Sequence, residues 1–138
     1  MTGDDEESLA ELFWGVARRL RHQSRRTLEP WEINPGHARA LAVLMRHGAL
    51  RLSTLAEQLH IAPRSTTEVV DGLQERGLVE RRPDPEDRRA TLVALTDEGT
   101  RVGAAIRAAR NAEAERFFGD LDEADRADLA RILRTLRD

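Results

Sequence analysis

The sequence predicts a mainly α-helical fold with one small β-hairpin, arranged as a winged helix-turn-helix between long terminal helices. Three observations support this prediction. Apolar residues recur at three- and four-residue steps in the first and last thirds of the chain. Two short helical segments are separated by roughly four residues near Pro63. A turn rich in proline and aspartate divides two β-prone segments, residues 78–82 and 88–96.

The first helix is predicted over about Ser8–Leu28, where the apolar residues form one stripe and Pro30 ends the helix. The stripe comprises Leu9, Leu12, Phe13, Val16 and Leu20. A second helix opens at Asn34-Pro35, because asparagine caps a helix N-terminus and proline suits the first helical position. Gly48 closes this helix, whose inward residues are Leu41, Leu44 and Met45.

The helix-turn-helix is predicted from the next two segments. Ser53 is expected to cap a short third helix, residues 54–60, that buries Leu55, Ala56 and Leu59. Pro63 can start a fourth helix that runs to about Arg76, with Gly77 as its C-cap. The buried side of the fourth helix consists of Val69, Val70 and Leu73.

The β-hairpin, or wing, follows in "LVERR", "PDPED" and "RRATLVALT". Its apolar anchors are Leu78, Val79, Leu92, Val93 and Leu95. The loop is too long for a two-residue turn, so its tip should project and be mobile. Two arginine pairs flank the loop, Arg81-Arg82 before it and Arg88-Arg89 at its end.

Two further helices complete the chain. Thr96 is expected to cap a long fifth helix that Gly119 ends, and Asp122 to cap a sixth helix with Asp125 three residues later. The apolar stripe of the fifth helix is Val102, Ala105, Ile106, Ala109 and Phe117, and that of the sixth is Leu129, Ile132, Leu133 and Leu136.

Composition limits the function classes. The 138 residues contain no cysteine, which excludes disulfides and cysteine-ligated metal sites. The acidic start "TGDDEES" is unlike a signal peptide, and no apolar run reaches about 18 residues, so a cytoplasmic location is expected. We find no phosphate-binding glycine loop, nucleophile elbow or paired buried carboxylates, which predicts no enzyme and no cofactor. Metal binding is not expected either. The four histidines are His22, His37, His47 and His60, and no two of them share a helical face with a carboxylate.

The predicted winged helix suits double-stranded DNA. The second helix of such a pair fits the major groove, and its first turn here carries Arg64, Ser65, Thr66 and Thr67. Arginine can read guanine O6 and N7, while the hydroxyls can meet phosphates or bases. The wing arginines can enter the minor groove, where the negative potential is strong. The alternative is a solvated hairpin whose charges pair with one another, since residues 50–95 carry seven arginines against eight acids.

The stretch "LSTLAEQLHIAPRSTTEVVDGLQERGLVERRPDPEDRRATLVALTDEG", residues 52–99, closely resembles the MarR family of bacterial transcriptional regulators. Its most specific parts are "VVDGLQERGLVERRPDPEDRRA" and "VALTDEG". The resemblance implies one domain, residues 1–138, with a DNA-binding part at 48–96 and helical dimerisation parts at 1–34 and 97–138. It implies a homodimer in which each chain offers one winged helix to one half-site. The apolar stripes of the terminal helices favour a dimer independently, unless they pack on the chain's own winged helix.

The family's wing element, Asp-x-Arg, matches Asp87 and Arg89. The resemblance implies that Arg89 enters the minor groove, that Asp87 supports the wing by a charged hydrogen bond, and that Arg88 meets a phosphate. Arg64, Ser65 and Thr67 match the recognition helix.

The chain departs from its relatives at three positions. Many relatives have a basic residue at Glu68 and another at Gly72, and Ala62 replaces the usual polar helix cap, which costs about 1 kcal/mol.

Family members often bind small aromatic acids between the dimer helices and the winged helix. Candidate pocket residues in that region are Trp14, Arg18, His22, Trp31, His37 and Arg39. The alternative for most of them is a structural role: Trp14 in the core or an interface, His22 and His37 on the surface or in a cap.

We therefore expect a sequence-specific DNA-binding regulator, a repressor more than an activator, acting as a homodimer on a pseudo-palindromic operator. A small aromatic or anionic effector would release it from DNA. The competing hypothesis is a winged helix that has lost DNA binding and contacts a protein partner, which Glu68 and Gly72 favour.

Overall fold

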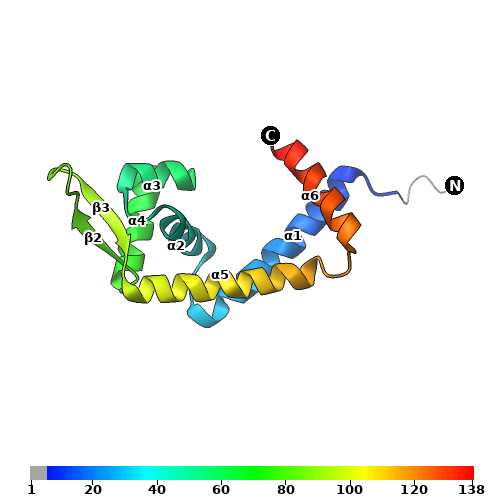
Figure 1. The fold of residues 1–138 in the computed structure, drawn as a ribbon, viewed down its shortest axis with the longest axis horizontal. Helices are drawn as coiled ribbons and strands as arrows, with labels where there is room; N and C mark the ends of the chain where they lie inside the picture. The colour runs from blue at the N-terminus through cyan, green and yellow to red at the C-terminus, as the bar shows by residue number, and fades with distance from the viewer. Residues whose placement is uncertain (1–5) are drawn as a thin grey trace.

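The computed structural model describes residues 6–138 and has the predicted fold class (Figure 1). Its elements are α1 (Leu9–Leu28), the short 3-10 helix η2 (Glu29–Trp31), α2 (Pro35–His47), β1 (Leu50–Arg51), α3 (Leu52–Leu59), α4 (Pro63–Glu75), β2 (Val79–Pro83), β3 (Thr91–Leu95), α5 (Asp97–Phe117) and α6 (Glu123–Arg137). The molecule is elongated: α5 runs along it, the winged helix lies at one end, and α6 and the start of α1 lie at the other.

Side-chain caps set the N-termini of four helices, and the sequence predicts three of these caps, at Asn34, Thr96 and Asp122. Asn34 Oδ1 accepts from the amide of His37 at 2.8 Å, Thr96 Oγ1 from Gly99 at 3.0 Å, and Asp122 Oδ1 from Asp125 at 2.8 Å. Ser8 and Glu11 form a reciprocal capping box at the start of α1. At the other end of α2, Gly48 caps the helix with φ 78°, a left-handed value that glycine adopts without strain.

Two predictions for the helix-turn-helix are wrong in detail. Ser53 does not cap α3, because the helix already begins at Leu52 and its N-cap is Arg51. The reason is the strand β1, which the sequence did not predict: Leu50 and Arg51 pair with Val93 and Leu92 and hold the chain extended up to the helix. Gly77 is not the C-cap of α4 either; Arg76 is, and Gly77 follows with φ 73°.

The sheet has three antiparallel strands in the order β1-β3-β2. The wing proper is the β2–β3 hairpin, in register from Val79↔Leu95 to Pro83↔Thr91. The hydrophobic core underneath it joins α2, α3, α4, the sheet and the first half of α5. Its central side chains are Leu41, Leu44, Leu55, Leu59, Val70, Leu73, Val79, Val93, Val102 and Ile106.

The start of α5 is docked tightly on the start of β2. The Thr96 amide donates to the Leu78 carbonyl at 3.1 Å, and Thr96 Oγ1 donates to the Gly77 carbonyl at 2.6 Å. A Cβ placed on Gly99 would lie 1.8 Å from the Leu78 carbonyl oxygen, so only glycine fits there. This contact fixes the long helix against the wing.

The apolar stripes of α1 and α6 are exposed in the single chain. Leu12, Phe13 and Val16 are each 50% exposed and Leu136 is 72% exposed. The alternative that these stripes pack on the chain's own winged helix is therefore wrong, since α1 and α6 lie largely beyond it along α5 (Figure 1).

Candidate DNA-binding surface

The first turn of α4 divides into an exposed and a buried side. Arg64 and Ser65 are exposed. Thr67 is half-buried, and its hydroxyl donates to the Pro63 carbonyl at 3.1 Å. Ala62 provides no side-chain cap, as expected, so the helix begins with its amides uncapped by a side chain.

Thr66 corrects the predicted DNA-contact set. Its side chain is fully buried and its hydroxyl donates to the Ala62 carbonyl at 3.1 Å. It shares the inner face of α4 with Val70 and Leu73, four and seven residues later. Thr66 thus belongs to the core, and we leave it out of the candidate surface.

The two positions of α4 at which this chain differs from many relatives, Glu68 and Gly72, have different surroundings. Glu68 is exposed. Gly72 lies against the His37 ring of α2, and a Cβ at this position would be 2.7 Å from His37 Cε1. Burial, and then the positive charge of Arg76, lower the pKa of His37, which favours the neutral ring. Gly72 therefore serves close packing of α4 on α2.

The first arginine pair of the hairpin is engaged with acids and amides. Arg81 Nη2 lies 2.7 Å from Asp71 Oδ1, and its Nη1 donates to the Gln74 side chain, both on α4. Arg82 Nη2 lies 2.7 Å from Glu80 Oε1 on the same strand. The interpretation of a hairpin whose charges pair with one another is correct for Arg82 only, because the partners of Arg81 lie on α4.

The second pair lies in the turn that joins β2 to β3. Among residues 6–138, no ion pair or hydrogen bond involves the guanidinium group of Arg88 or Arg89. Asp87 supports this turn through the backbone: its carboxylate accepts from the Arg89 amide at 3.0 Å and its carbonyl from the Ala90 amide at 2.9 Å. Both guanidinium groups are thus available to a partner at the tip of the hairpin.

Sequence reasoning missed the residues that hold the base of the wing. Asp84 belongs to the proline- and aspartate-rich turn that the sequence predicts, and no role is predicted for Arg51. Asp84 is buried, and its Oδ2 lies 2.9 Å from Arg51 Nε and 2.8 Å from Arg51 Nη2. The Glu86 amide, and next the Arg51 guanidinium, lower the pKa of the Asp84 carboxyl below its ordinary value. No local pattern joins these two positions, which lie 33 residues apart.

The predicted effector residues make separate contacts in the single chain. Trp14 is exposed and stacks edge-on against Phe13. Arg39 donates to the Leu59 carbonyl at 2.6 Å, and His37 packs on Gly72. The Trp31 carbonyl accepts from Arg76 at 2.7 Å. Arg18 and His22 lie on the exposed surface of α1. None of the six lines the pocket that the structure forms between α2 and α5.

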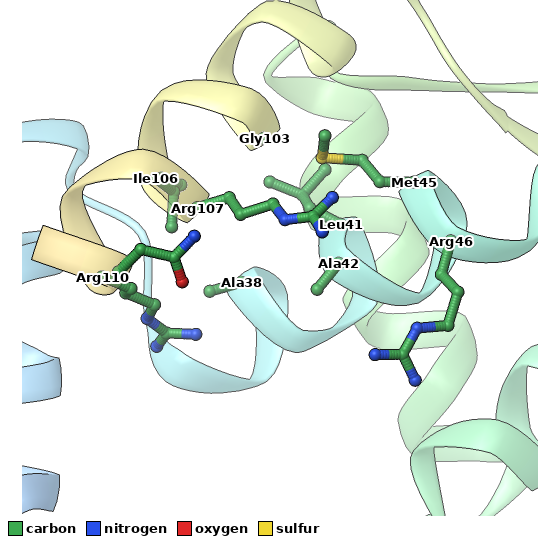
Figure 2. A pocket seen from close by; sticks show the side chains of 10 residues that line it. Ala38, Leu41, Ala42, Met45, Arg46, Gly103, Ile106, Arg107 and Arg110 are labelled. Atoms are coloured by element: carbon green, nitrogen blue, oxygen red, sulfur yellow. The ribbon is translucent and has the colours of Figure 1, made fainter. Parts of the chain in front are cut away.

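That pocket has a volume of about 250 Å³ (Figure 2). Ala38, Leu41 and Met45 of α2 form its apolar side. Figure 2 shows the side chains of Arg107 and Arg110 extending from α5 toward α2. Arg110 Nε is buried and has no hydrogen-bond partner among the described residues; Gln23 Oε1 on α1 is in the same situation. Burial lowers the pKa of Arg110, because no anion compensates the lost hydration.

Comparisons with known proteins agree with this geometry. The model of the MarR family matches residues 33–91. An HTH-type transcriptional regulator of Mycobacterium leprae, ML2140, is 32% identical over 78% of this chain and 75% of its own length. The chain belongs to the MarR family. The HTH-type transcriptional repressor MdtR of Bacillus subtilis is 29% identical to this MarR-family chain over 99% of it and 85% of the relative.

The solved structures contain the same MarR fold. A MarR family protein from Bacillus stearothermophilus superposes with a TM-score of 0.83 at 25% identity, over 94% of this chain and 90% of that one. Members of this family are DNA-binding transcriptional regulators and not enzymes. In the part of the chain that the structure describes, no helix is long and apolar enough to cross a membrane, and no three metal-ligating side chains cluster.

Proposed function

We propose that this MarR-family regulator is a homodimer that binds a pseudo-palindromic operator and represses transcription in the cytoplasm. The proposal rests on the different pairing of the two arginine pairs in the wing. Among residues 6–138, Arg88 and Arg89 at its tip have no acidic partner, while Arg81 and Arg82 are paired. A projecting guanidinium suits the minor groove, where the phosphates of both strands concentrate negative potential.

The recognition helix supplies the second contact. Arg64 and Ser65 are exposed in the first turn of α4, so they can face base edges in the major groove. Arg64 can make the bidentate contact with guanine O6 and N7, whereas Ser65 and Thr67 suit phosphates. The exposed Glu68 would accept from a cytosine amino group, which would make it a specificity residue.

The dimer is supported by the exposed apolar surface of the terminal helices. This surface comprises Leu9, Leu12, Phe13, Trp14, Val16, Leu20, Ile132, Leu133 and Leu136. Contiguous apolar surface of this kind usually marks an interface. A second copy fits best, because twofold pairing of residues 1–34 and 97–138 would place two winged helices, residues 48–96, on successive major grooves. Repression is proposed from the name of the relative MdtR.

Fluorescence anisotropy with labelled duplexes from the gene's own upstream region tests DNA binding. We expect saturable binding that weakens steeply as salt rises, since each phosphate contact releases counterions. The absence of binding to every upstream duplex, or binding independent of salt, would contradict the proposal. It would favour the protein-interaction module that has lost DNA.

An effector is a second proposal, supported by the pocket between α2 and α5. Its apolar side and its arginines suit a small organic anion with a flat apolar body, and Arg110 Nε has no hydrogen-bond partner within residues 6–138. Such a ligand would cause the dimer to release DNA if it binds more tightly to a conformation in which the two winged helices do not match the spacing of the half-sites.

Calorimetric titration with benzoate and nicotinate tests this pocket. We expect binding that the Arg110→Gln variant loses and that the Arg101→Gln variant keeps, because Arg101 on the same helix is paired with Glu98 away from the pocket. If neither anion binds the wild-type protein, or if Arg110→Gln binds them equally well, this pocket is not an effector site for aromatic acids.

A further inference from the structure

Asp84 is the one buried charged residue of residues 6–138. A buried carboxylate is costly unless hydrogen bonds and a counter-ion compensate it, so its position needs a physical reason. It stands directly after β2, where the in-register pairing of the hairpin ends at Pro83↔Thr91. The seven residues 84–90 beyond that point carry both tip arginines.

Asp84 joins this loop to the body of the domain. Arg51 Nε donates to its Oδ2, Arg51 Nη2 lies 2.8 Å from the same oxygen, and the Glu86 amide donates to its Oδ1 at 2.9 Å. Its own amide donates to the Ala90 carbonyl at 3.0 Å, and its carbonyl accepts from the Asp87 amide at 3.2 Å. Asp84 thereby fixes both sides of the turn as well as its link to Arg51.

Arg51 connects Asp84 to the helix-turn-helix, α3 and α4. It pairs with Leu92 in the sheet and is the N-cap residue of α3, the first helix of the helix-turn-helix. The ion pair therefore joins the wing loop to the pair α3–α4. The only other side-chain ion pair between the described wing strands and these helices is Arg81–Asp71, farther from the tip.

We propose that Arg51 and Asp84 are positioning residues that hold the wing tip at a fixed direction relative to the recognition helix, so that Arg89 reaches the minor groove and Arg88 a phosphate while α4 occupies the major groove. This inference rests on the proposed DNA contact of the tip. The domain itself should fold without the pair, because its core is made of α2, α3, α4 and the buried residues Val79 and Val93.

A double-mutant cycle tests the assignment. Operator affinity is measured by anisotropy for wild type, Asp84→Asn, Arg89→Ala and the double variant, at one salt concentration. We expect Asp84→Asn to weaken binding about tenfold in the wild-type background and at most about threefold in the Arg89→Ala background, because only the Arg88 contact then remains to be lost. Arg101→Gln, which breaks an ion pair on α5, is the matched control and should bind like wild type.

The outcomes separate the two proposals. If Arg89→Ala weakens binding and Asp84→Asn does not, or if Asp84→Asn weakens both backgrounds equally, the positioning role is wrong while the DNA contact stands. If Arg89→Ala binds like wild type, the DNA contact of the tip is wrong and the positioning role falls with it.

A measurement without DNA gives an independent check. Arg51→Gln should lower the amide ¹⁵N order parameters of Arg88 and Arg89, whereas those of Val70 and Leu73 in α4 should stay the same. Unchanged order parameters at the tip would overturn the proposal even if affinity falls. This variant also serves if Asp84→Asn fails to fold.

Discussion

Arginine is used in two ways within one hairpin. Arg81 and Arg82 pair with Asp71 and Glu80, while Arg88 and Arg89 form no ion pair within residues 6–138. The formal charge of −1 over residues 50–95 therefore does not show how these arginines divide between paired and unpaired positions. What decides DNA binding is the place of the unpaired guanidinium groups, because screened surface pairs contribute little to the field that a phosphate meets.

Arg89→Ala should reduce operator affinity by about 1–3 kcal/mol, since it removes a charged contact in the minor groove. The melting temperature should change little, because the guanidinium has no partner in the described part of the chain. Anisotropy and thermal unfolding measure the two quantities. Arg116→Ala, a change to an exposed arginine on α5, is the control and should leave both unchanged. An Arg89→Ala protein that binds as tightly as wild type would refute the wing contact.

The lowered pKa of Asp84 predicts a pH dependence. A carboxyl whose pKa is lower in the folded than in the unfolded protein, where it is about 3.9, adds stability that is complete above that value. This stability is lost as pH falls through the lower folded pKa. The difference in unfolding free energy between wild type and Asp84→Asn should thus be constant from about pH 5 to 8 and shrink below about pH 4. A difference that persists undiminished at pH 2 to 3 in denaturant titrations would show that the charge of Asp84 is irrelevant.

The sequence allows some of these residue roles to be predicted, but not all of them. Thr66 could have been assigned to the core, because it precedes Val70 and Leu73 by one and two helical turns. The Arg51–Asp84 pair could not, because a contact over 33 residues depends on the sheet that brings the two side chains together.

The N-termini of the helices could be predicted from the sequence where the capping residue and the amide it accepts from are close along the chain. The caps at Asn34, Thr96 and Asp122 each involve residues three positions apart, so the sequence predicted these three caps; the cap at Ser8 has the same spacing but was not predicted. The strand β1 and the start of α3 escaped prediction, because two residues become a strand only by pairing with β3 some forty positions later. The same tertiary pairing displaced Ser53 from the predicted cap.

The contact between α5 and β2 gives an element-scale prediction. Gly99→Ala should lower the unfolding free energy by about 3 kcal/mol, because its Cβ would overlap the Leu78 carbonyl, which is backbone and cannot rotate away. Urea titration followed by circular dichroism measures the change. Gly15→Ala in α1, where a Cβ meets nothing within 4 Å, should instead be neutral or raise stability by up to about 1 kcal/mol. Equal stability of the two variants would mean that α5 is not docked as described.

The whole molecule divides into a packed winged helix and a helical part with uncovered apolar surface. The core residues belong mainly to the first part, whereas Leu12, Phe13, Leu133 and Leu136 remain exposed in the second. A chain of this shape can bury those side chains against a second copy. Sequence periodicity identified the stripes, but only the three-dimensional arrangement separates them from the winged helix (Figure 1).

Leu133→Glu should therefore shift the protein from dimer to monomer in sedimentation velocity, because a charge in the proposed interface would lose its hydration. Operator affinity should fall with it, since a monomer can engage one half-site only. Thr135→Glu, at another exposed position of α6, is the control. A wild-type protein that sediments as a monomer at micromolar concentration would contradict the proposed dimer.

The most direct test of the central claim is selection of bound duplexes from a random pool by the wild-type protein and by Arg64→Ala. We predict an enriched pseudo-palindrome whose half-sites lie about one helical turn apart, with relaxed base preference for Arg64→Ala. A wild-type pool that shows no enriched sequence, or a single half-site without twofold symmetry, would contradict a dimeric operator-binding regulator.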